Sequence, residues 1–85
     1  MVSRGRYDDV VKLPLITSSA HKHHIHDDDI LHAFDNPIFA DDLDEGLAMF
    51  IGPDRVGNLL EIGVIDSAEG PIVIHAMTAR AKYLR

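Results

Sequence analysis

The sequence predicts an α+β fold, with short N-terminal helices packed on a three- to four-stranded antiparallel meander sheet and a short C-terminal helix. Apolar residues recur at helical spacing within residues 27–34, whereas from residue 38 onward the apolar period shortens to two, as in strands. Turn-forming residues separate the later apolar runs at close intervals, which favours neighbouring strands that pair antiparallel. An amphipathic helix is the natural cover for the apolar face of such a sheet.

The N-terminal residues show weaker signals than the rest of the chain. Residues 1–16 have no clear period and Pro14 interrupts their apolar run, so we expect a poorly ordered arm with at most a short strand. Residues 17–85 are then expected to form one domain, because a chain of 85 residues has room for a single core. Hydroxyls at residues 17–19 are N-cap candidates for a first short helix that ends near His24.

The segment DDILHAF predicts a second and better-defined helix. Asp27 is its expected N-cap, and Asp28 and Asp29 fall in the first turn, where the helix dipole favours negative charge. Its apolar face consists of Ile30, Leu31 and Phe34. The helix should end before Pro37, because the residue that precedes a proline is disfavoured in helical conformation.

Four apolar segments then predict strands. The first opens at residues 38–40 and is followed by the turn DDLDEG, and the others are LAMFIG, LLEIGVID and PIVIHAM. In LLEIGVID, side-chain alternation places Leu60, Ile62 and Val64 on one face and Leu59, Glu61 and Ile65 on the other. In PIVIHAM, it places His75 on the face of Val73 and Met77. The segment TARAKYLR predicts a C-terminal helix capped by Thr78.

Charge and composition narrow the functional classes. The net charge is −6, and the region from His23 to Asp54 carries nine acids with no lysine or arginine, which disfavours broad nucleic-acid binding. The absence of cysteine excludes disulfides and thiolate metal sites. No apolar run is long enough to span a membrane and no secretory signal is evident, so we expect a cytoplasmic protein without a membrane partner. A chain this short is also compatible with a homodimer.

Five of the six histidines lie in the stretch HKHHIHDDDILHAFDNPI. His21 and His24 are three residues apart, as are His23 and His26, which would suit metal ligands on one helical face. However, adjacent histidines followed by adjacent aspartates form no recognised ligand frame. We therefore expect no metal and no cofactor, and keep a histidine-cluster metal-binding protein as a minor hypothesis.

The same stretch resembles a motif of BrnT-type toxins, which belong to the RelE/ParE-like group of bacterial type II toxin-antitoxin systems. In that motif a Lys-His-Gly-aliphatic start precedes a short acidic helix that ends in Phe, an acid or amide, and Pro. The matching residues here are Lys22, His23, Ile25, Asp28, Asp29, Phe34, Asp35 and Pro37, and His24 replaces the glycine. IGPDRVGNLLEIGV is similar to the family's strand–turn–strand, and IVIHAMTARAKY to its closing strand and helix. The resemblance covers residues 20–83.

This resemblance implies a RelE-like fold and a metal-independent ribonuclease that inhibits translation. It also implies neutralisation by a cognate antitoxin, expected to be of the ribbon-helix-helix type. Such RNA cleavage needs a base, an acid and cations that stabilise the charged phosphorane. The expected catalytic residues are His75, Arg80 and His23. The expected RNA-phosphate ligands are Arg55, Lys82 and Arg85, and the expected antitoxin-docking residues are Asp27, Asp28 and Asp29.

Two departures from the family keep an alternative open. Met77 stands where the family usually has arginine, and His75 stands in place of its serine. Loss of a phosphate-binding arginine would abolish cleavage unless Arg80 takes over its role. The second hypothesis is therefore a non-enzymatic interaction module on the same fold, in which His75 is a half-buried sheet residue and the cations are solvated.

Overall fold

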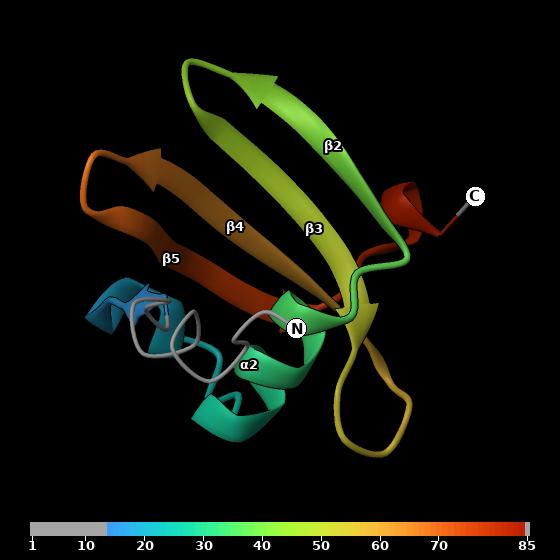
Figure 1. Ribbon diagram of the computed structural model, residues 1–85. Helices are drawn as coiled ribbons and strands as arrows, with labels where there is room; N and C mark the ends of the chain where they lie inside the picture. The colour runs from blue at the N-terminus through green and yellow to red at the C-terminus, as the bar shows by residue number, and fades with distance from the viewer. Residues whose placement is uncertain (1–13, 85) are drawn as a thin grey trace, which may run out of the picture.

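A mixed five-stranded sheet with one α-helix against one of its faces organises residues 14–84, which are the residues that the computed structural model describes (Figure 1). In chain order the elements are β1 (Leu15–Ile16), the 3₁₀ turn η1 (Ser18–His21), α2 (Asp27–Asp35), β2 (Phe39–Asp44), β3 (Leu47–Pro53), β4 (Leu59–Ser67), β5 (Gly70–Thr78) and the 3₁₀ turn η2 (Ala81–Tyr83). The spatial order of the strands is β1-β5-β4-β3-β2. The α+β class is therefore confirmed, and no helix among these residues is long and apolar enough to cross a membrane.

The predicted meander is present as β2 to β5, each antiparallel to the next. The prediction of a wholly antiparallel sheet was wrong, because β1 pairs in parallel with β5 and adds a fifth strand. Leu15 and Ile16 lie opposite Ile72 and Val73, so the last two residues of the predicted arm belong to the sheet. The rest of the arm, residues 1–13, lies outside the described part of the chain.

Both predicted terminal helices are single 3₁₀ turns. The first is confined to Ser18–His21 and is followed by His24 in the left-handed region (φ 61°). At the C-terminus Thr78 does not cap a helix, because it still pairs with Leu60 in the sheet. The Ala79 N–H also donates to the Leu59 carbonyl at 2.9 Å, which keeps the chain extended until Arg80.

Helix α2 begins one residue earlier than its predicted cap implied. His26 is the N-cap, and its ring Nδ1 accepts a hydrogen bond from the Asp28 N–H at 3.2 Å. Asp27 is consequently the first helical residue rather than the cap. All three aspartates then lie in the first turn, where the helix dipole stabilises their charge.

Strand β2 extends further than residues 38–40 because its aspartates pair with β3. Asp41 and Asp42 lie opposite Met49 and Ala48, and a bulge follows between Asp42 and Asp44. The predicted turn DDLDEG was therefore too long. The reversal takes place at Glu45 and Gly46, which both adopt positive φ.

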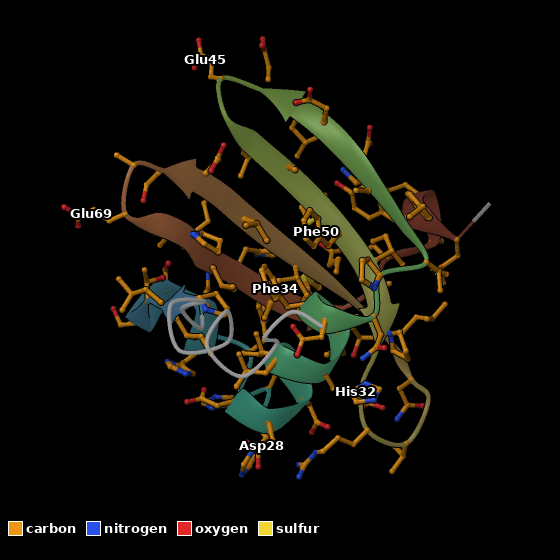
Figure 2. The ribbon with its side chains drawn as sticks, in the orientation of Figure 1. Asp28, His32, Phe34, Glu45, Phe50 and Glu69 are labelled. Atoms are coloured by element: carbon orange, nitrogen blue, oxygen red, sulfur yellow. The ribbon has the colours of Figure 1, made fainter. Side chains whose placement is uncertain are left out.

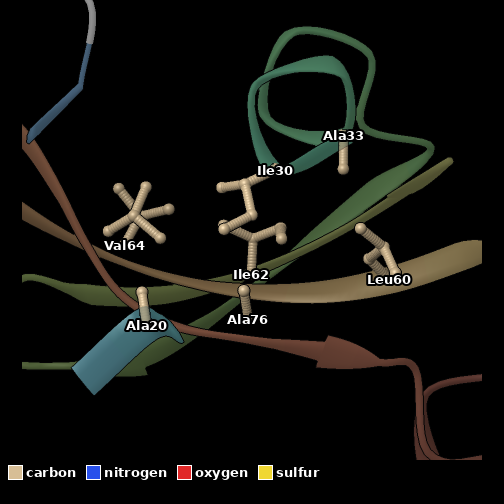
Figure 3. Packing of buried hydrophobic residues seen from close by; sticks show 8 residues of the cluster. Ala20, Ile30, Ala33, Leu60, Ile62, Val64 and Ala76 are labelled. Carbon is tan, nitrogen blue, oxygen red and sulfur yellow. The ribbon is translucent and has the colours of Figure 1, made fainter. Parts of the chain in front are cut away.

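The main core lies between the sheet and the layer formed by α2 and η1 (Figure 3). Its buried residues are Ala20, Ile30, Ala33, Leu60, Ile62, Val64, Val73 and Ala76, so the predicted inner face of the third apolar strand is confirmed. Phe34 of α2 stacks on Phe50 of β3 with ring centroids 5.6 Å apart (Figure 2). The opposite face carries a smaller cluster of Met49, Ile51, Ala79 and Tyr83, packed against Leu59.

A bulge in β5 changes the predicted faces of the last strand. His75 pairs with Gly63, but the next pair is Val73 with Val64, so Ile74 is an extra residue. Val73 therefore joins the main core, whereas His75 lies on the opposite face with Met77. The prediction that His75 shares a face with Val73 was wrong, because alternation holds only for an uninterrupted ladder.

Candidate functional site

A buried carboxylate on β4 forms the centre of the candidate site. Glu61 is completely inaccessible to solvent (0% exposed), although apolar residues flank it along the strand. It lies on the face of the sheet opposite α2, because its strand neighbours Leu60 and Ile62 point into the main core. A buried charge of this kind requires partners that replace the lost water.

Two residues from the end of β5 and the segment after it supply those partners. Arg80 donates from its backbone N–H (2.9 Å), its Nε (3.0 and 3.1 Å) and its Nη2 (2.7 Å), and so holds both oxygens of the Glu61 carboxylate. His75 Nε2 lies 2.8 Å from Glu61 Oε2. Gly63 is opposite His75, and a Cβ added there would lie 3.0 Å from the His75 Cβ, so this glycine leaves room for the imidazole.

These contacts stabilise the ionised form of Glu61. Burial alone would raise the pKa of this carboxyl, but hydrogen bonds from Arg80 and His75 outweigh burial and lower the pKa from 4.5 to about 2. The same pairing raises the pKa of Arg80 above its ordinary value. Glu61 is therefore a fixed negative charge that orients an imidazole and a guanidinium.

The third predicted catalytic residue lies beside this group. The His23 ring meets the His75 ring edge-on, with centroids 6.0 Å apart and an interplanar angle of 81°. His23 comes from the segment between η1 and α2, which is close to β5 because η1 packs against that strand. Of the three residues that the sequence predicted as a catalytic set, His75 and Arg80 thus contact the Glu61 carboxylate, and His23 lies beside the His75 ring.

The cluster buries its carboxylate and exposes its reactive groups. The side chains of His75 and Arg80 are 29% and 48% exposed, and His23 is exposed as well. Glu61 contacts Nε2 of His75, which leaves Nδ1 as the ring nitrogen for proton exchange. An imidazole held by a carboxylate next to an exposed guanidinium is suited to acid–base chemistry on a phosphate ester.

Of the predicted phosphate ligands, Lys82 shares an aromatic neighbour with Arg80 of this cluster. Its Nζ is 5.1 Å from the centroid of the Tyr83 ring, and Arg80 Cζ is 5.8 Å from the same centroid. The two cations therefore contact one aromatic ring. Arg85 lies outside the described residues.

Arg55, in contrast, is engaged by helix α2. From the turn between β3 and β4 it donates through its backbone N–H (3.0 Å) and its Nε (2.8 Å) to Asp29, and its Nη1 lies 3.5 Å from Asp28. The remaining predicted docking residue, Asp27, contacts His21. All three acids predicted to dock a partner therefore have intramolecular contacts, and their role in docking stays a prediction.

The Arg55 contact yields a direct titration test. Hydrogen bonds from the side chain and backbone of Arg55 lower the pKa of Asp29 from 3.8 to about 2. In Arg55→Ala, we expect that pKa to rise toward 3.8, because the side-chain bonds are lost and only the backbone bond remains. Side-chain carboxyl NMR against pH measures the change, with Lys82→Ala as the matched loss of one cation elsewhere. An Asp29 pKa that is the same in both variants would contradict the observed pairing.

Sequence reasoning missed Glu61 as the centre of the site. It placed this residue correctly on the face opposite Leu60, but assigned it no role. The sequence did contain a signal for this site, which is the single acid in the apolar run LLEIGVI. A charged residue inside such a strand is rarely buried without partners, so this acid indicated a buried polar cluster. Which partners it would have depended on the bulge in β5, which the sequence did not reveal.

The histidine-rich stretch does not assemble a metal site in residues 14–84. No three histidine, aspartate or glutamate side chains in this part of the chain gather closely enough to hold an ion. Comparison of the chain with protein-family models, curated proteins and solved structures found no match in any of the three.

Proposed function

We propose that this protein is the toxin component of a bacterial toxin-antitoxin system, a metal-independent ribonuclease that inhibits translation in the cytoplasm. The observation that carries the proposal is that the buried Glu61 carboxylate holds His75 and Arg80 together, with the His23 ring edge-on to that of His75. The sequence predicted these three residues as catalytic, and they come from two separate parts of the chain. A cognate antitoxin of the ribbon-helix-helix type would neutralise the toxin.

Each residue of the cluster has a role in this proposal. One of the two histidines, His75 or His23, is the base that removes the proton of the 2′-hydroxyl. The other is the acid that protonates the leaving oxygen. Arg80 stabilises the phosphorane, which compensates for Met77 at the position where the family usually has arginine. Glu61 is a positioning residue, because it holds the imidazole and the guanidinium without contact with the RNA.

The backbone at His24 supports the resemblance to BrnT-type toxins. His24 has a φ of 61°, in the left-handed region where glycine is favoured over other residues. This is the position at which the family motif has glycine. The local conformation is therefore the one that a glycine in the motif would serve.

An RNA cleavage assay with chelator present tests the proposal. We expect the purified protein to cleave single-stranded RNA, and His75→Ala to lower the rate by about 10²–10⁴-fold, the usual contribution of a general acid or base. His24→Gly is the matched control, because it removes a neighbouring exposed histidine at a position that suits glycine. Equal rates for wild type and His75→Ala, with both proteins folded by circular dichroism, would contradict the proposal.

One observation favours the interaction module as the second candidate. Three groups of Arg80, its backbone N–H, Nε and Nη2, already donate hydrogen bonds to Glu61. Part of the capacity of Arg80 to bind a phosphate is therefore used within the protein. A folded wild-type protein that leaves RNA intact, and whose expression alone does not slow bacterial growth, would favour this module over the ribonuclease.

A further inference from the structure

Strand β2 forms one edge of the sheet (Figure 1). All six of its residues are exposed. Among the described strands it pairs only with β3, so alternate backbone N–H and C=O groups along its outer side have no strand partner. On the other side of the sheet, β1 and η1 cover the outer side of β5, and the two-residue strand β1 forms the edge. The edge formed by β2 is therefore a template on which another strand can pair.

The charge of this edge is uniformly negative. Asp41, Asp42 and Asp44 lie along β2, and Glu45 extends from the tip of the hairpin, well away from the body of the sheet (Figure 2). Within residues 14–84, no lysine, arginine or histidine forms an ion pair with any of these four acids. They differ in this respect from Asp27, Asp28 and Asp29, which all have basic partners.

Apolar side chains accompany these acids. Phe39 and Leu43 are 41% and 38% exposed, and Ile38, just before the strand, is 61% exposed. Charges and a bulge on an edge strand oppose indiscriminate pairing, so this edge would select its partner by charge. A second copy of the chain is disfavoured, because pairing of two β2 strands would place aspartates opposite aspartates.

We propose that the β2 edge binds an extended segment of a partner protein in which lysine or arginine alternates with apolar residues. The segment adds a sixth strand to the sheet, and its backbone bonds to the outer side of β2. Its cations, which share one face, lie beside the aspartates on that face of the sheet. This interaction is independent of the proposed RNA cleavage, since β2 contributes no residue to the Glu61 cluster.

The test uses a capped peptide of alternating lysine and valine, six residues long to match β2. Titration followed by backbone NMR should give saturable binding, with shifts and slowed amide exchange centred on β2. The double variant Asp41→Lys/Asp42→Lys should bind the peptide at least about tenfold more weakly, because attraction becomes repulsion. The variant Asp66→Lys/Glu69→Lys, with the same charge change at the end of β4 and in the β4–β5 turn, is the matched control and should keep near wild-type affinity.

Two further peptides separate strand pairing from charge attraction alone. Both have the sequence and charge of the lysine–valine peptide. In one peptide the N-methyl groups replace the alternate N–H groups that face β2, and in the other they replace the alternate N–H groups that face away from β2. We expect the first of these peptides to lose binding and the second to retain it. Equal binding of both, equal binding of a glutamate–valine peptide, or no binding at millimolar concentration would overturn the proposal. So would a wild-type dimer in sedimentation that Asp41→Lys/Asp42→Lys dissociates.

Discussion

Glu61→Gln should lower the free energy of unfolding at about pH 7 by on the order of 3 kcal/mol, the largest effect that we expect from an isosteric change. The amide fits the same buried position but carries no charge for Arg80 and His75. This loss follows from the pKa of Glu61, which the fold lowers from 4.5 to about 2. Urea unfolding of both proteins measures the difference.

The pH dependence of this difference identifies its cause. Because the folded-state pKa lies below the ordinary value, the contribution of Glu61 is fully present above pH 4.5 and is lost as the pH falls toward about 2. The gap between wild type and Glu61→Gln should therefore close over that range. Asp66→Asn, an exposed change on the same strand, is the control and should alter stability by less than about 0.5 kcal/mol. A gap that stays constant with pH would show that packing, not charge, makes the difference.

Gly52→Ala should destabilise the fold by about 3 kcal/mol, because the added methyl group has no room. A Cβ at residue 52 would lie 2.5 Å from the Ala33 carbonyl oxygen and 3.0 Å from that of Asn36. Both atoms belong to the backbone at the C-terminal end of α2, so the clash is relieved only if the helix moves away from β3. Thermal or urea unfolding measures the loss.

Gly57→Ala is the matched control for this substitution. Gly57 has a φ of 97° but no atom within 4 Å of an added Cβ, so alanine there meets backbone strain without a clash. We expect a cost of about 1 kcal/mol. A Gly52→Ala variant that is no less stable than Gly57→Ala would contradict the close approach of α2 to β3.

The elements that the sequence predicted well are those with local signals. Helix α2 has an apolar face, acids in its first turn and a proline after its end, all within residues 27–37. Strands β3, β4 and β5 are apolar runs separated by glycine-containing turns, and the inner faces of β3 and β4 follow from alternation. Strand β2 was underestimated because four of its six residues are polar or small, and only its pairing with β3 makes it a strand.

The features that escaped sequence analysis depend on distant contacts. Strand β1 has only two residues, and its identity depends on Ile72 and Val73 more than fifty positions later. The bulge at Ile74 has no local signature, yet it decides which of Val73 and His75 faces the main core. The candidate residues themselves were chosen from chemistry, whereas the carboxylate that holds two of them became apparent only from the register of β4 and β5.

The parallel pairing of β1 with β5 has a kinetic consequence. The meander closes through short hairpins, but β1 and η1 must wait until β5 exists, and the intervening loop carries a greater entropic cost of closure. The hydroxyls of Thr17 and Ser19 then hold this segment against β5, because they donate hydrogen bonds to the carbonyl oxygens of Val73 (3.1 Å) and Ile74 (2.7 Å), respectively. We therefore expect the meander to form first and the segment of β1 and η1 to dock last.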